Sequence, residues 1–184
     1  MIDTALPEPT LQPDEILVLD LQAARGMLFT KRTKVGKTYD NALKILEEAI
    51  PTILVRGFTV AKLGNAFLAD QCGLTAYEAK EAKKLLSRQG IITLVEMSVA
   101  GKSVATWRLN DALLRVEKRK FKNIWSLRYY WQEALGAERA DRLWDHCYEK
   151  TDPRRTPKKL LVTARTLNED EWVELKSLDR TPVS

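Results

Sequence analysis

Apolar residues recur at spacings of three and four positions along most of the chain, and this pattern predicts a mainly helical protein. The first such segment covers residues 13–28, where Pro13 and two acidic residues precede an apolar run at helical spacing. We expect a helix there, ending near Gly26, and the run ILVL at 16–19 leaves a β-strand as the alternative. Prolines 7, 9 and 13 predict that residues 1–12 form a flexible arm.

A second apolar face follows in the sequence YDNALKILEEAIPTILV at residues 39–55, which predicts a helix. Ala42, Ile45 and Ala49 lie on one side of it. Pro51 predicts a kink or a new turn, because proline has no backbone N–H to donate to the preceding turn. This helix is expected to open a module that continues to residue 109.

Residues 68–86 (LADQCGLTAYEAKEAKKLL) have the composition of two helices joined at Gly73. Glycine permits the left-handed backbone of a tight turn, and Ala69 is small enough for a close helix crossing. Thr75 and Glu78 have the spacing of a capping box, which predicts where the second helix begins. Apolar residues at helical spacing then turn inward, so the opposite face is left to the solvent.

The sequence after the second helix predicts a β-hairpin. Gly90 is suited to end the helix, and two β-rich runs at 91–97 and 103–109 flank the turn SVAGKS. Lys102 is expected near the tip of this hairpin.

The order helix, turn, helix and hairpin in residues 39–109 resembles the winged helix-turn-helix superfamily of DNA-binding proteins, and no narrower family. The resemblance implies three helices with a β-hairpin wing, and a recognition helix that starts at Thr75. The segment TVAKLGNAFLADQ at 59–71 departs from the common pattern and predicts a longer second helix.

The resemblance also implies that DNA is contacted by the outer face of the second helix and by the wing. Lysines suit contacts with phosphates, and side chains for bidentate reading of bases begin only at Arg88. The predicted DNA-binding residues are Thr75, Ala76, Tyr77, Lys80, Lys83, Lys84, Arg88 and Lys102.

An apolar stripe in residues 111–135 predicts a helix of roughly 24 residues that ends before Gly136. Aromatic residues favour an interface, so we expect a homodimer that uses Phe121, Ile124, Leu127 and Trp131. The alternative is a second nucleic-acid surface, in which Trp125, Tyr129 and Tyr130 stack on bases.

The remaining chain predicts a smaller extension. Residues 137–150 form a second amphipathic helix, expected to pack antiparallel on the first around Gly136. Residues 151–184 predict a basic linker, a possible strand and a short capped helix. The domains are therefore an arm at 1–12, an N-terminal helix with a winged helix at 13–110, a helical pair at 111–150 and the C-terminal extension. Additional phosphate contacts are expected from Arg154, Arg155, Lys158 and Lys159.

The net charge of +5 is distributed unevenly. Residues 31–135 hold 19 basic and 10 acidic residues, whereas residues 1–30 are acidic and residues 136–184 are neutral. A basic centre favours a polyanionic partner, and a solvated basic face is the alternative. Charged residues make up 30% of the chain, and neither a signal peptide nor an apolar run of about 20 residues is present, so we expect a cytoplasmic protein.

No motif for catalysis or metal binding emerges. Cys72 and Cys147 are isolated, which indicates no structural metal or disulfide. The sequence VGKT ends like a phosphate-binding loop, but Lys31 stands where that loop needs glycine. His146 has no nucleophile in a recognisable motif beside it. We therefore expect neither an enzyme nor a cofactor.

Together these patterns predict a DNA-binding protein that acts on duplex DNA as a dimeric transcription regulator, with no membrane contact and no identifiable effector. The alternatives are an accessory factor for replication or mobile-element maintenance, and a winged-helix adaptor that binds proteins.

Overall fold

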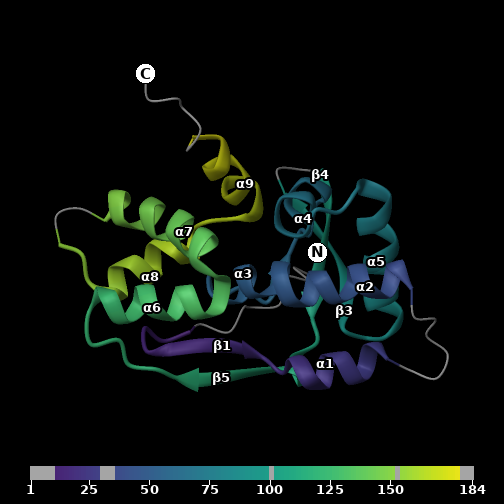
Figure 1. Ribbon diagram of the computed structural model, residues 1–184, viewed down its shortest axis with the longest axis horizontal. Helices are drawn as coiled ribbons and strands as arrows, with labels where there is room; N and C mark the ends of the chain where they lie inside the picture. The colour runs from purple at the N-terminus through teal and green to yellow at the C-terminus, as the bar shows by residue number, and fades with distance from the viewer. Residues whose placement is uncertain (1–10, 30–35, 100–101, 152–153, 179–184) are drawn as a thin grey trace.

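The computed structural model describes residues 11–29, 36–99, 102–151 and 154–178, and it is mainly helical with two small antiparallel sheets (Figure 1). A mainly α-helical chain was the sequence-based expectation, and it is confirmed. The predicted arm falls largely outside the described residues, as does the tip of the predicted hairpin. Leu11, the first described residue, is buried in the core.

A two-stranded sheet joins distant parts of the chain. β1 (Glu15–Leu19) pairs antiparallel with β5 (Leu114–Lys118), so that Glu15 lies opposite Lys118 and Leu17 opposite Val116. The prediction of a helix over 13–28 is therefore wrong at its start, where the alternative of a strand is correct. The helix α1 (Leu21–Leu28) begins only after Asp20, whose carboxylate accepts a hydrogen bond from the backbone N–H of Ala23, and it continues past Gly26.

The same pairing explains why the long helix predicted over 111–135 is wrong. A 3₁₀ turn, η2 (Asp111–Leu113), and β5 occupy its first half, and α6 (Ile124–Leu135) begins at the Asn123 cap. Each aliphatic run fits a helix or a strand when taken alone. Pairing with the other run, about a hundred residues away, satisfies the backbone groups of both and decides for the strand.

The first helix of the central module contains a π-helical turn. α2 (Lys37–Lys44) continues through the π segment η1 (Ile45–Ala49) into α3 (Ile50–Leu54). Pro51 has no N–H for the carbonyl four residues before it, and the N–H of Ile50 bonds to the carbonyl of Ile45. The predicted disturbance at Pro51 is thus confirmed, as a bulge within a continuous helix.

The second half of the module has the predicted order, with one difference. α4 (Asn65–Cys72) and α5 (Ala76–Arg88) precede a hairpin of β3 (Ile92–Val99) and β4 (Lys102–Leu109). The predicted longer second helix is wrong, because the short strand β2 (Val60–Ala61) pairs with Arg108 and Trp107 of β4. This three-stranded sheet has the order β2-β4-β3.

Four helices follow β5 in the described part of the chain. α6 and α7 (Ala137–Lys150) pack as a pair around Gly136, as predicted. α8 (Pro157–Arg165) replaces the predicted strand, because Thr156 caps its first turn and Pro157 favours a helix start. α9 (Glu169–Leu178) is the predicted short helix, and the side chain of Asn168 accepts a hydrogen bond from the N–H of Glu171.

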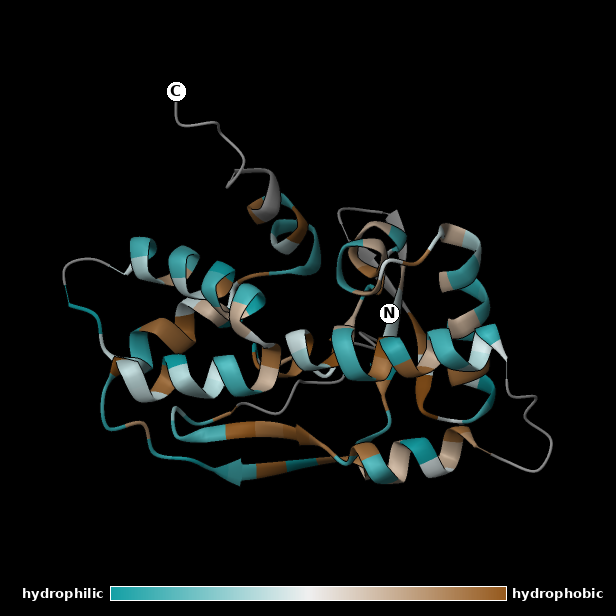
Figure 2. Ribbon diagram, in the orientation of Figure 1, coloured by the Kyte–Doolittle hydropathy of each residue, from teal (hydrophilic) through white to brown (hydrophobic). Residues whose placement is uncertain are grey.

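One apolar core runs through the central module and the C-terminal helices. Apolar and polar residues alternate along most helices (Figure 2). Leu127 and Trp131, expected at a dimer interface, are completely buried in this core. The prediction that they contact a second subunit is therefore wrong, because their own chain covers them. Phe121 and Ile124 are half-buried against the same core. No helix in the described ranges is long and apolar enough to cross a bilayer.

Candidate nucleic-acid interface

The turn between α4 and α5 has the geometry that its sequence predicts. Gly73 adopts a left-handed backbone with φ of 67°, and its N–H bonds to the carbonyl of Ala69 over 2.9 Å. The hydroxyl of Thr75 then accepts a hydrogen bond from the N–H of Glu78, whose carboxylate accepts one from the N–H of Thr75. Each bond measures 3.2 Å, so the start of α5 is satisfied by a complete capping box.

The buried side of α5 packs against α2 and α4. The apolar residues that helical spacing predicted to turn inward are all buried, and they are Leu74, Ala79, Ala82 and Leu86. Ala69, expected at the close crossing of the two helices, is instead exposed. The inward positions of α4 are Phe67, Leu68, Gln71 and Cys72.

The opposite side of α5 is open to solvent and stands at one end of the molecule (Figure 1). Tyr77 lies on this side, and it is the most exposed large apolar side chain of the described residues, with 73% of its surface accessible. The predicted residues that lie exposed on this outer face are Thr75, Ala76, Tyr77, Lys80, Lys84 and Arg88.

Lys83 does not belong to this face. Its amine donates a hydrogen bond to the carbonyl of Leu63 over 3.0 Å and lies 5.9 Å from the ring centre of Trp107. Burial lowers the pKa of this amine. The prediction that Lys83 contacts DNA is therefore wrong, because the side chain turns back toward the sheet, where it joins α5 to β4.

Lys102, the predicted wing residue, begins β4, where its backbone pairs with Val99. The residues between them, Ala100 and Gly101, lie outside the described part of the chain, and so does the side chain of Lys102.

The two acidic residues of α5 are both paired with lysines. Glu78 bonds to Lys37 over 2.7 Å, which, together with the hydrogen bond from Thr75, lowers the pKa of its carboxyl. Glu81 bonds to Lys84 over 3.3 Å. Lys37 is 78% exposed and adds a cation beside the start of α5, where none from α2 was predicted from the sequence.

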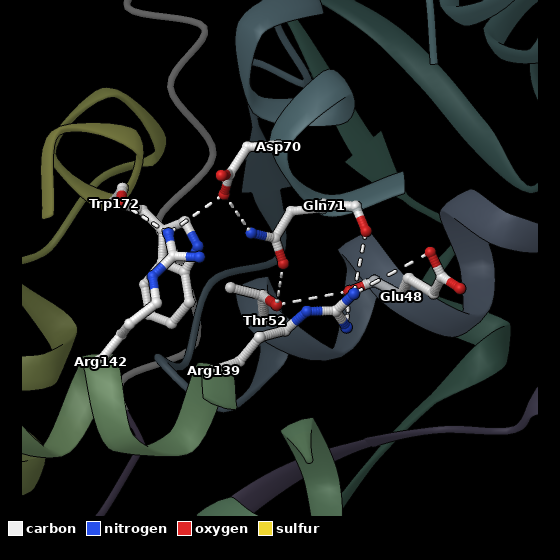
Figure 3. Close-up of polar contacts among 7 residues, drawn as sticks. All are labelled: Glu48, Thr52, Asp70, Gln71, Arg139, Arg142 and Trp172. Atoms are coloured by element: carbon white, nitrogen blue, oxygen red, sulfur yellow. Dashed lines mark hydrogen bonds and ion pairs between the residues drawn. The ribbon is translucent and has the colours of Figure 1, made fainter. Parts of the chain in front are cut away.

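A buried polar cluster connects α4 to the C-terminal helices α7 and α9 (Figure 3). Arg142 of α7 donates to a carboxylate oxygen of Asp70 over 3.1 Å and to the backbone carbonyl of Trp172 over 3.1 Å. The side-chain amide of Gln71 donates to the same oxygen of Asp70 over 2.7 Å. The hydroxyl of Thr52 in turn donates to the amide oxygen of Gln71 over 3.0 Å.

Arg139, one turn before Arg142, reaches the first helix as well as α4. Its guanidinium donates to the carbonyl of Glu48 over 3.1 Å and to the carbonyl of Gln71 over 2.9 Å. Neither arginine was predicted from the sequence. Their spacing of three on an amphipathic helix was the one available signal, and it does not identify partners that lie far away in the sequence.

An apolar hollow of about 270 Å³ lies between β1, the π segment and α6. Leu17, Leu46, Leu54 and Tyr130 contribute to its lining. Glu47 is the charged residue of this lining, and it pairs with Arg25 of α1.

His146, Cys72 and Cys147 are described residues of types that can act in catalysis. His146 is half-buried, and burial lowers its pKa. Burial raises the pKa of Cys72 and of Cys147 to about 12, so both remain thiols at neutral pH. Within the described ranges, no three His, Cys, Asp or Glu residues gather into a potential metal site. Lys37 begins α2 after Gly36, and the element before it in the described chain is the helix α1, not the strand that a phosphate-binding loop follows.

Comparison of the chain with protein-family models, curated proteins and solved structures gave no significant match.

Proposed function

We propose that residues 37–109 form a winged helix-turn-helix domain that binds duplex DNA, and that the protein is a transcription regulator. The observation that carries this proposal is the exposed outer face of α5. It presents three basic side chains, Lys80, Lys84 and Arg88, on a capped helix that a tight glycine turn joins to α4.

The order of elements supports the proposal. A helix, a short strand, two helices and a hairpin follow one another, and β2 pairs with β4, the second strand of the hairpin. The core of this unit lies on the buried side of α5. A groove-binding helix needs its core-packing side chains and its DNA-contacting side chains on opposite sides, because the outer residues must meet DNA without weakening the fold.

The charge of the face suits phosphates better than bases. Lys80 and Lys84 are one turn apart, and Lys37 lies next to the helix start through its bond to Glu78. Glu78 and Glu81 are offset by their lysine partners, which leaves the face basic. We therefore expect much of the affinity to come from the phosphate backbone, with release of counterions.

The experiment that tests the proposal is selection of bound sequences from random duplex DNA, followed by titrations of a selected duplex at several salt concentrations. Each phosphate contact contributes about −0.9 to the slope of log affinity against log salt. Lys80→Ala and Lys84→Ala are each expected to flatten this slope by roughly one. Lys62→Ala is the matched control, because Lys62 pairs with Asp170 of α9.

A protein-binding adaptor is the second candidate, and the exposed Tyr77 beside Ala76 favours it, since aromatic residues are enriched in protein interfaces. The same titrations separate the two functions. Affinity for duplexes that does not change with salt, or equal slopes for the wild type, Lys80→Ala and Lys84→Ala, would contradict DNA binding through α5.

A further inference from the structure

The end of the molecule opposite α5 carries an unusual set of aromatic side chains. The start of α6, the end of α7 and the start of α8 meet there (Figure 1). Trp125 of α6 is 60% exposed, and Tyr129, one turn later on α6, is 59% exposed. Two large aromatic side chains exposed one turn apart on the same helix form an apolar patch, and such patches often mark a binding site.

Three of the rings form a continuous stack. Trp125 lies on Trp144 with ring centres 5.7 Å apart and an interplanar angle of 26°, and Trp144 lies on Tyr148 with values of 5.6 Å and 25°. Arg155 closes the far end, with its guanidinium 3.6 Å from the ring centre of Tyr148. We call these four residues the aromatic ladder.

The ladder holds the ring of Trp125 in place and leaves one side of it open. Trp144 covers one face of that ring and is itself almost completely buried. The exposed surface of Trp125 therefore belongs to its other face and its edge. A ring fixed in this way is a ready platform for a further planar group, because little side-chain entropy remains to be lost on stacking.

Basic residues border the ladder on both sides in the sequence. Residues 118–128 and 150–159 together contain ten basic residues and one acidic residue. Lys120, Lys122, Arg154, Lys158 and Lys159 are exposed. α7 between them is more acidic, but its Asp141 is paired with Arg128, which lies 5.2 Å from the ring centre of Trp144.

We propose that the aromatic ladder is a binding site for single-stranded nucleic acid, in which a base stacks on Trp125 and the flanking lysines and arginines meet the phosphates. Open aromatic faces within a basic surface suit such strands, since every base has a π face and unpaired bases are accessible to it. The bases inside duplex DNA are stacked on both faces and offer no open face to Trp125. This site is separate from α5 and does not depend on the proposed duplex binding.

The test is fluorescence anisotropy with a dye-labelled homothymidine oligonucleotide and an abasic strand of the same length. Trp125→Ala is expected to weaken binding of the homothymidine strand about 5- to 150-fold, the range found for loss of one base–aromatic stack. Trp125→Phe is expected to retain most of the affinity, because a smaller ring still stacks. The wild type is expected to bind the abasic strand more weakly than homothymidine.

Phe29→Ala is the matched control, because Phe29, the residue that follows α1, is 58% exposed and its ring packs on Tyr39 of α2 and not on the ladder. It is expected to leave the affinity unchanged. Thermal melting of each variant shows whether the fold is retained, and the phenylalanine variant keeps the comparison valid if the alanine variant is less stable.

Three results would overturn the proposal. These are equal affinities of the wild type and Trp125→Ala, equal affinities of the wild type for the homothymidine and abasic strands, and a change from dimer to monomer in sedimentation for Trp125→Ala with oligonucleotide binding intact. The third result would identify the ladder as an interface between two copies of the chain. Lys80→Ala is expected to keep oligonucleotide binding, so failure of duplex binding and failure of this site are distinguishable.

Discussion

Arg142 donates a hydrogen bond to Asp70 over 3.1 Å, and both side chains are more than nine-tenths buried (Figure 3). The guanidinium also lies 4.9 Å from the ring centre of Trp172 and bonds to the carbonyl of that residue. One side chain of α7 thus holds α4, which precedes the turn at Gly73, and α9, near the described end of the chain.

Loss of one member of this pair is expected to be costly. Arg142→Ala leaves the carboxylate of Asp70 buried without its cation, and we expect the free energy of unfolding in urea to fall by about 3–5 kcal/mol. Arg25→Ala is the control, because it breaks the exposed pair with Glu47 and should cost less than about 1 kcal/mol. Equal losses of unfolding free energy in the two variants would show that the buried pair contributes no more to stability than the exposed pair.

Gly73 is required for its backbone conformation and not for space. With φ of 67° and nothing within 4 Å of an added Cβ, Gly73→Val is expected to cost about 1–3 kcal/mol through backbone strain alone. Gly73→Asn should cost less, because asparagine tolerates the left-handed region. Gly26→Ala, inside α1 where a Cβ also meets nothing, should instead stabilise by about 0.5–1 kcal/mol. Thermal melting of the three variants measures the difference, and a neutral Gly73→Val would contradict the assignment.

Ala82 and Ala69, on the buried and exposed sides of the helix pair, are expected to respond differently to enlargement. Ala82 is fully buried on the packed side of α5, so Ala82→Leu should overpack the core and cost about 1–3 kcal/mol. Ala69 is exposed on α4, so Ala69→Leu should change the melting temperature little. The opposite order in denaturant unfolding would mean that the inward and outward faces of the pair are exchanged.

Stability is expected to fall on mild acidification because of His146. Burial and, to a smaller degree, Lys150 lower the pKa of its imidazole below the usual 6.5, while Glu171 and Glu149 act in the opposite direction. The unfolded chain therefore binds a proton more readily, and the free energy of unfolding decreases as the pH falls through 6.5 until the folded-state pKa is passed.

Thermal melting between about pH 7.5 and about pH 5.5 tests this linkage. His146→Gln cannot titrate and should show a shallower dependence than the wild type. Identical curves for the two proteins would rule out a contribution from His146.

Both cysteines are expected to be unreactive in the folded protein. Cys72 and Cys147 are buried and their pKa values are raised to about 12, so the reactive thiolate is scarce at neutral pH. A chromogenic disulfide reagent should detect no thiol before denaturant is added and two thiols afterwards. Ala69→Cys is the positive control, because position 69 is exposed and its thiol should react at once. Rapid reaction of the wild type would contradict the buried placement.

Features that depend on a few neighbouring residues could be predicted from the sequence. The glycine turn at Gly73, the capping box of Thr75 and Glu78 and the pairing of α6 with α7 around Gly136 were all predicted correctly. A left-handed backbone and a cap are decided within about four residues, so their residue types reveal them. The exposed positions of Tyr77, Lys80 and Lys84 followed from the same helical period.

Features that need a distant partner are set by the folded chain and could not be predicted from local sequence. The run at 16–19 becomes a strand because β5 pairs with it, and Trp131 is core because α7 covers the side of α6 that appeared suited to a second subunit. Lys83 turns inward because its amine binds the carbonyl of Leu63 and lies over the ring of Trp107 on that side. The Arg142–Asp70 pair spans 72 positions. Periodicity shows which residues share a face, but the partner of that face is set by chain segments that no local pattern specifies.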